Sequence, residues 1–237
     1  RVLFRSIDHS HVIIPLTFKS PGYNPASDFT PLAGVATYYN VMAVSSAAQI
    51  GSLKELGPWL KANPGKANFG IPAAGSVPQF AGLLVGQALG SPMVAIPYKG
   101  GAQLVQDLLG NQVSVGFLSL SETIQHHSAG KMKVLAVSGT SRAQSAADIP
   151  TFTELGIKGM EINPWLGFFG PKGMSADFTN RFSQAVATVL RDPEVADKLG
   201  KMGNVPTYAS PAQLQQWVTS ATAAWGPVIK NSGFELQ

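Results

Sequence analysis

The middle of the chain switches repeatedly between two patterns of apolar positions. Between Asn68 and Ser138, short apolar runs are followed by glycine-containing turns and then by stretches with apolar residues every three or four positions. The first pattern is typical of buried strands and the second of amphipathic helices. The predicted strands are Asn68–Ile71, Met93–Pro97, Val113–Phe117 and Lys133–Ser138. The predicted helices are Ser52–Ala62, Val77–Leu89, Ala102–Leu109 and Ser121–Ala129. Strands that alternate with helices indicate an α/β fold with a parallel sheet and right-handed crossovers.

The pattern changes after Arg142. A turn-rich stretch, 143–165, leads into the apolar segment Leu166–Phe169. The predicted helices beyond it are Asp177–Leu190, Pro193–Met202 and Pro211–Val228. This late shift suggests that the chain leaves one α/β lobe and packs onto another.

Three of these helices begin with a capping signal. Ser76, Ser119 and Ser210 are each followed three residues later by Gln or Glu. In a capping box the serine accepts from a helix amide, and the Gln or Glu side chain reaches back to the serine amide. The pattern therefore predicts that the helices start next to these serines.

The composition is typical of a globular protein and excludes several kinds of functional site. It has 237 residues, of which 45% are hydrophobic and 13% charged, and it has no cysteine. No run approaches the unbroken apolar length that spans a bilayer. The absence of cysteine excludes disulfides, thiolate catalysis and cysteine-bound zinc. The formal net charge is +4, but the basic residues are scattered singly, so we predict a solvated surface and no nucleic-acid partner.

Catalytic motifs are absent. The sequence has no Gly-x-Ser-x-Gly elbow and no His-Glu-x-x-His. Gly70 and Gly75 have the spacing of a phosphate-binding loop, but Ser76 stands where that loop requires lysine. His9 and His11 would share a face in a strand, yet only Asp8 could join them as a metal ligand. We therefore predict no enzyme activity, no cofactor and no metal site.

The loop before the Val77–Leu89 helix suggests anion binding. A helix N-terminus offers unpaired amides and about half a positive charge. Gly75, Ser76 and Val77 lie at this start, after the small residues Ala73 and Ala74. Small residues let a carboxylate approach the backbone closely. A strand-to-helix turn with a well-capped helix is the alternative interpretation.

Two more loops repeat this arrangement. Tyr98, Lys99 and Gly100 lie between the strand Met93–Pro97 and the next helix, and Ser119 follows the strand Val113–Phe117. In a parallel sheet the carboxyl ends of these strands meet at one edge. The sequence therefore predicts a shared ligand site at that edge.

These residues resemble the Bug receptors, the substrate-binding proteins of tripartite tricarboxylate transporters. The matching segments run in family order through nearly the whole chain. They include 28-DFTPLAGVATYYNVMAV-44, 75-GSVPQFAGLL-84, 96-IPYKGGAQLVQDLLGNQV-113, 148-DIPTFTELGI-157, 164-PWLGFFGPKG-173 and 210-SPAQL-214.

The resemblance implies a two-lobe, periplasmic type II binding fold with parallel-rich sheets flanked by helices. It implies a lobe 1 formed by residues 1–40 and 143–237, incomplete at its N-terminus, and a lobe 2 formed by 41–142. It adds Trp165 to the ligand-binding residues Gly75, Ser76, Val77, Tyr98, Lys99, Gly100 and Ser119. We expect a monomeric periplasmic receptor that closes on a small organic acid and delivers it to a membrane permease. No export signal is present in the sequence.

Two features separate this chain from the family pattern. The family's opening strand and proline- and glycine-rich loop are missing, and Leu118-Ser119 stands where a polar pair such as Asp-Asn is usual. The second difference removes an expected carboxylate from the site. The alternative function is the type II effector-binding domain of a transcription regulator. Such a regulator needs an N-terminal helix-turn-helix, and nothing between Arg1 and Asn40 has that pattern.

Overall fold

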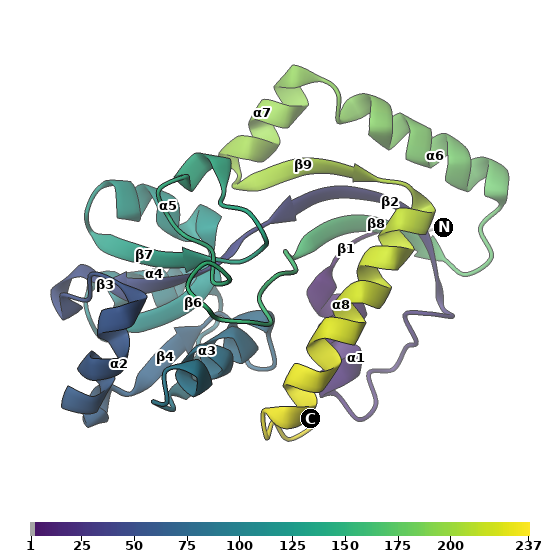
Figure 1. The fold of residues 1–237 in the computed structure, drawn as a ribbon. Helices are drawn as coiled ribbons and strands as arrows, with labels where there is room; N and C mark the ends of the chain where they lie inside the picture. The colour runs from purple at the N-terminus through teal and green to yellow at the C-terminus, as the bar shows by residue number, and fades with distance from the viewer. Residues whose placement is uncertain (1–2) are drawn as a thin grey trace. The chain divides into compact units, whose positions relative to one another are not determined.

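The computed structural model describes residues 3–237, which form two compact units (Figure 1). The first unit contains the chain up to Tyr38 together with Pro164–Gln237, and the second contains Tyr39–Asn163. Each unit has its own sheet, of four strands in the first and five in the second.

The second unit is built on a mixed sheet. Its strands are β3 (Asn40–Ser45), β4 (Asn68–Ile71), β5 (Val94–Pro97), β6 (Val115–Ser119) and β7 (Met132–Val137), in the order β5-β4-β6-β3-β7. β4 pairs in parallel with β5 and β6, as predicted, whereas β3 is antiparallel to β6 and β7. β3 follows β2 with only Tyr39 between them, whereas β4, β5 and β6 are each reached through a helix, the connection that parallel strands require.

The helices of the second unit lie close to the predicted bounds. They are α2 (Leu53–Ala62), α3 (Val77–Ala88), α4 (Gly101–Leu109) and α5 (Leu120–Ser128). Each end is within one residue of its prediction. α3 packs tightly on the sheet, because a Cβ added at Gly82 would collide with the ring of Phe69.

The segment 143–163 belongs to the second unit, which moves the expected boundary at residues 142 and 143 to Asn163 and Pro164. Ala143, Ala146 and Ile149 join a buried cluster with residues of β3, α4 and β7. Val137 of β7 also donates to Pro150 O and accepts from Phe152 N, at 3.0 and 2.9 Å. The segment 143–163 has no helical or strand periodicity. It belongs to the second unit because its apolar side chains are buried in the core of that unit.

The first unit has a sheet in which every neighbouring pair is antiparallel. Its strands are β1 (Phe4–Ile7), β2 (Phe29–Tyr38), β8 (Trp165–Pro171) and β9 (Asn204–Ala209), in the order β1-β8-β2-β9. The expectation of parallel-rich strands is therefore wrong for this sheet. β2 carries the chain out of the unit and β8 brings it back, so these neighbours run in opposite directions.

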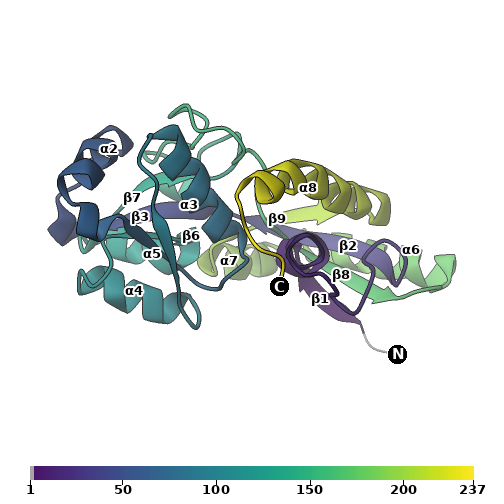
Figure 2. The same cartoon turned by 90° about the horizontal axis from the view of Figure 1, so that it is seen from below.

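Five helical segments accompany this sheet. They are η1 (His9–Ile13), α1 (Ile14–Thr17), α6 (Ala176–Val189), α7 (Pro193–Lys201) and α8 (Pro211–Asn231). Figure 2 shows α8 lying along the sheet, and α8 also packs against η1 and α1. Short 3₁₀ turns occur at Ser46–Ala48, Pro64–Lys66 and Gln144–Ala146.

His9 and His11 lie on the helical turn η1 and not on a strand, so they do not share a face as a metal pair would require. The Asp8 carboxylate accepts from His9 N at 2.9 Å and starts this turn. Among residues 3–237, no group of three or more His, Cys, Asp or Glu side chains is placed to hold a metal ion. None of the helices in this range is long and apolar enough to cross a membrane.

Candidate functional site

The loops that follow β4 and β5 are joined at one edge of the five-stranded sheet. Tyr98 N donates to Ile71 O at 2.8 Å, and Gly100 N donates to Pro72 O at 2.9 Å. β6 ends at the same edge, because β4 is parallel to it. The structure therefore brings together the three predicted loops at the carboxyl ends of parallel strands.

The start of α3 differs in detail from the predicted capping box. Gln79 Oε1 accepts from Gly75 N at 2.7 Å instead of from Ser76 N, and Gln79 N donates to Ser76 O at 2.9 Å. Ser76 Oγ donates to Ala73 O at 2.6 Å. Within residues 3–237, no hydrogen bond is found for the amides of Ser76 and Val77. These two amides, and not that of Gly75, are the donors left for an anion.

Gly75 and Gly100 both adopt positive φ angles, of 63° and 107°. The left-handed backbone at Gly75 turns the chain from β4 into α3, and a branched side chain there would strain it. A loss of ligand affinity in a Gly75 variant could therefore come either from a lost ligand contact or from backbone strain, so such variants do not test the site.

The start of α4 is already occupied by a carboxylate of the protein. A Cβ added at Gly101 would collide with the Glu122 carboxylate, so that group lies directly against the first residue of α4. Glu122 Oε2 also accepts from Ser119 N at 3.2 Å and from Ser119 Oγ at 2.6 Å. The predicted capping box at Ser119 is thus confirmed. Glu122 therefore supplies a carboxylate at this edge of the sheet. The presence of Leu118-Ser119 in place of a polar pair had predicted that a carboxylate would be missing there.

Tyr98 and Lys99 differ in how they are held. The Tyr98 hydroxyl donates to Asp107 Oδ2 at 2.9 Å. Burial, together with this bond and the negative charge of Asp107, raises the pKa of Tyr98 to about 12. The hydroxyl is therefore neutral and engaged with α4, whereas the Lys99 side chain is exposed and supplies a positive charge.

Trp165 belongs to the other unit, where it is the first residue of β8 and is only 2% exposed. Its ring centroid lies 6.4 Å from that of His11 and 6.0 Å from that of Phe169. The indole Nε1 is buried without a hydrogen-bond partner. The structure therefore gathers seven of the eight predicted ligand residues in the second unit and places Trp165 in the first.

Glu122 is the residue of this edge that sequence analysis missed as part of the site. Its position three residues after Ser119 was recognised, but only as a capping signal. The contact with Gly101 depends on how β5 and β6 lie in the sheet, which no local pattern reveals.

Two α/β units, one of which collects helix starts at the carboxyl edge of its sheet, define the class of two-lobe periplasmic binding proteins of type II. Within that class, the chain belongs to the family described as the tripartite tricarboxylate transporter family receptor, whose model matches residues 4–234. The match confirms the resemblance to the Bug receptors.

The relatives agree with this placement. The protein BugT of Bordetella pertussis is 26% identical over 215 residues, which cover 91% of this chain and 66% of BugT. The structure of the periplasmic binding protein BugD is 28% identical with a TM-score of 0.86, covering 99% of this chain and 79% of that one. The structure of Rpa4515 from R. palustris with adipate is also 28% identical, with a TM-score of 0.87 and coverage of 98% and 77%. The chain spans 62–66% of the length of several curated relatives that it matches, BugT among them.

Proposed function

We propose that this chain is a periplasmic receptor for a small organic acid, a di- or tricarboxylate or a related carboxylate, and that it serves a tripartite tricarboxylate-type membrane transporter. The observation that carries the proposal is the pair of unengaged amides of Ser76 and Val77 at the start of α3. The family of transporter receptors and the adipate in the structure of Rpa4515 support it. The proposed receptor is a monomer and has a permease as its partner.

The start of α3 suits a carboxylate for three reasons. The helix has 12 residues, so its N-terminus carries the partial positive charge of a full macrodipole. Ser76 and Val77 are 8% and 5% exposed, and charge-assisted hydrogen bonds are stronger where water is excluded. Lys99, on the neighbouring loop, is exposed and adds a positive charge to this edge of the sheet.

Glu122 restricts where the ligand carboxylate is held. The start of α4 has its own carboxylate at Gly101, and a second one there would meet like-charge repulsion. The ligand is therefore directed to α3. The Tyr98 hydroxyl and the Gly100 amide are engaged within the protein and keep the adjoining loop in place.

Calorimetric titration of the 237-residue chain with adipate tests the proposal, and adipamide is the control. Adipamide has the same carbon chain but no negative charge. We expect adipate to bind more tightly by about tenfold or more, which corresponds to about 1.4 kcal/mol. Equal affinities for adipate and adipamide would contradict a carboxylate receptor.

A further inference from the structure

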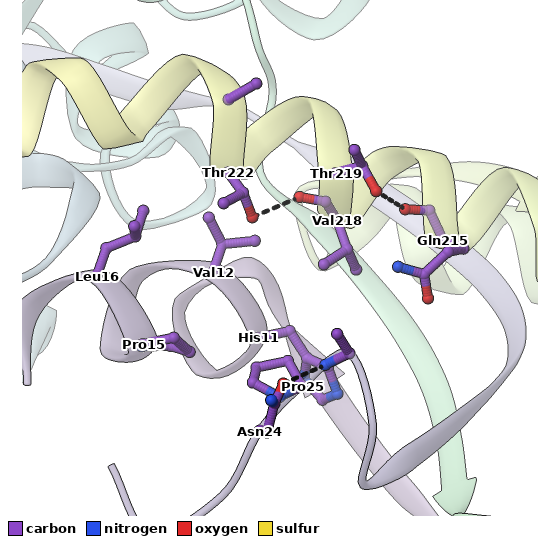
Figure 3. A pocket seen from close by; sticks show the side chains of 12 residues that line it. His11, Val12, Pro15, Leu16, Asn24, Pro25, Gln215, Val218, Thr219 and Thr222 are labelled. Carbon is purple, nitrogen blue, oxygen red and sulfur yellow. Dashed lines mark hydrogen bonds between the residues drawn. The ribbon is translucent and has the colours of Figure 1, made fainter. Parts of the chain in front are cut away.

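The two faces of the first unit's sheet are covered differently, because successive side chains of β8 point to opposite faces. Phe169 faces η1, and its ring stacks on that of His11 with centroids 3.8 Å apart. On this face η1, α1 and α8 leave a pocket of about 430 Å³ between them (Figure 3). Phe168 faces α6 instead and meets the ring of Phe182 edge-on, with centroids 5.5 Å apart. The second face is therefore covered by α6.

α6 carries an apolar stripe that is largely exposed. Its members recur at the spacing that places side chains on one side of a helix: Phe178, Phe182, Ala185 and Val189. Phe178 and Val189 are 40% and 53% exposed. Ala185 is also exposed, and Phe182 is half-buried. A contiguous exposed apolar surface of this kind is typical of an interaction site.

The side of α6 that meets the sheet is polar in the first half of the helix. Thr179 and Ser183 are buried there, and Ser183 Oγ is hydrogen-bonded to the Tyr208 hydroxyl of β9 at 2.8 Å. The stripe lies beside this polar side. Its two phenylalanine rings, at 178 and 182, are stacked with centroids 6.0 Å apart. The apolar surface is therefore ordered before any partner binds.

The stripe is complementary to itself in size. In an antiparallel pair of α6 helices, a twofold axis at the middle of the stripe places Phe178 opposite Val189 of the second copy. The same axis places Phe182 opposite Ala185 of the second copy. Large side chains therefore meet smaller ones, which allows the two helices to interdigitate. A twofold contact is closed, so the assembly stops at two copies.

The charges at the two ends of α6 fit the same pairing. Asp177 lies in the first turn of the helix, and Arg191 lies just beyond its last residue and is exposed. The Asp177 side chain is 78% exposed, although it contacts Arg181 of its own helix at 3.6 Å. An antiparallel pair brings Asp177 beside Arg191 of the second copy, twice in each dimer. A parallel pair would instead bring the two Asp177 carboxylates together.

We propose that the apolar stripe of α6 is a self-association surface, on which a second copy of this chain docks in antiparallel orientation. One helix pair buries less than the roughly 1,000 Å² expected of a stable interface, so the association is weak and reversible. At low concentration the chain is the monomer proposed above. The surface lies wholly within the first unit, so the inference stands whether or not the chain binds an organic acid.

Sedimentation equilibrium of the full chain between about 10 μM and about 1 mM tests the pairing, with two neighbouring residues of α6 as matched variants. Ala185 belongs to the stripe and Gln184 does not, and both are exposed. Ala185→Glu should raise the dissociation constant of the dimer by about tenfold or more, because it buries a carboxylate against the second copy. Gln184→Glu adds the same charge outside the stripe and should change it by less than about threefold.

Three outcomes would overturn the proposal. They are a wild-type chain that stays monomeric at about 1 mM, an assembly that grows beyond two copies, and equal effects of the two variants.

Charge reversal tests the antiparallel orientation. Arg191→Glu places like charges beside Asp177 of the second copy and should weaken the dimer by about threefold or more at low salt. Adding Asp177→Lys restores opposite charges in exchanged positions and should recover most of this loss. A double variant that associates no better than Arg191→Glu alone would rule out the antiparallel pair.

Discussion

Replacement of Asp8 by asparagine is expected to stabilise the protein at pH 8 and to change its stability little at pH 4. Asp8 is 4% exposed, and burial raises the pKa of its carboxyl group to about 7. Hydrogen bonds from His9 N and the Tyr38 hydroxyl, at 2.9 and 3.3 Å, oppose this shift without cancelling it. Above pH 7 the wild-type protein therefore holds a buried negative charge that asparagine avoids.

The sign of the effect follows from proton binding. Between about pH 4 and pH 7 the folded protein holds a proton on Asp8 that the unfolded chain has lost, so wild-type stability falls as the pH rises through this window. Asp8→Asn removes that dependence. The free energy of unfolding of the variant should exceed that of the wild type by on the order of 4 kcal/mol at pH 8. His11, with its lowered pKa, contributes an opposite trend below its ordinary pKa, but it is common to both proteins.

Urea unfolding of both proteins at pH 4, 6 and 8 measures this difference. Asp148→Asn is the matched control, because the Asp148 side chain is 79% exposed and its ion pair with His127 is long, at 3.8 Å. The control should change stability by less than about 0.5 kcal/mol at every pH. A destabilised Asp8→Asn protein at pH 8, or a difference that does not grow with pH, would show that Asp8 is not a costly buried carboxyl group.

Replacement of Val77 by proline is expected to weaken adipate binding strongly while leaving α3 intact. Proline at this position removes one of the two unengaged amides. The first position of a helix tolerates proline well, and Ser76 already has the extended backbone, φ −104° and ψ 160°, that precedes a proline. Hydrogen bonds to charged groups contribute about 1.5–3 kcal/mol, so the dissociation constant should rise by about tenfold or more.

Val77→Ala provides the comparison for this variant. Both substitutions remove the packing of a side chain that is 5% exposed, but only proline removes the amide. Calorimetric titrations with adipate should therefore show a large loss for Val77→Pro relative to Val77→Ala. If the two variants bind adipate equally, the loop is only a strand-to-helix turn.

Local signals predicted the helices and the strands that they connect. The predicted strand Asn68–Ile71 coincides with β4, and the helices of the second unit agree to within one residue, because serine, proline and glycine mark their ends. No strand was predicted over β1, β2 or β3, where the apolar residues follow neither period cleanly. Strand direction was also missed, since the antiparallel pairing of β2 with β8 depends on chain segments more than 120 residues apart.

The sequence predicted which loops form the candidate site, but it did not predict which atoms within them are hydrogen-bonded to each other. The loops around Ser76, Tyr98 and Ser119 do meet at one edge, as parallel pairing requires. The partners of individual groups could not be predicted. The bond from Gly100 N to Pro72 O depends on the register of β5 against β4, and the place of Glu122 depends on the packing of α5 beside α4.

An amide nitrogen–proton NMR titration of the chain with adipate tests most directly the claim that the start of α3 holds a carboxylate. We predict that the amide resonances of Ser76 and Val77 shift the most. The amide of Gly100, which already donates to Pro72 O, should shift little, and adipamide should leave all three unchanged. Unmoved resonances of Ser76 and Val77 while adipate binds elsewhere, or equal shifts with adipamide, would contradict the account.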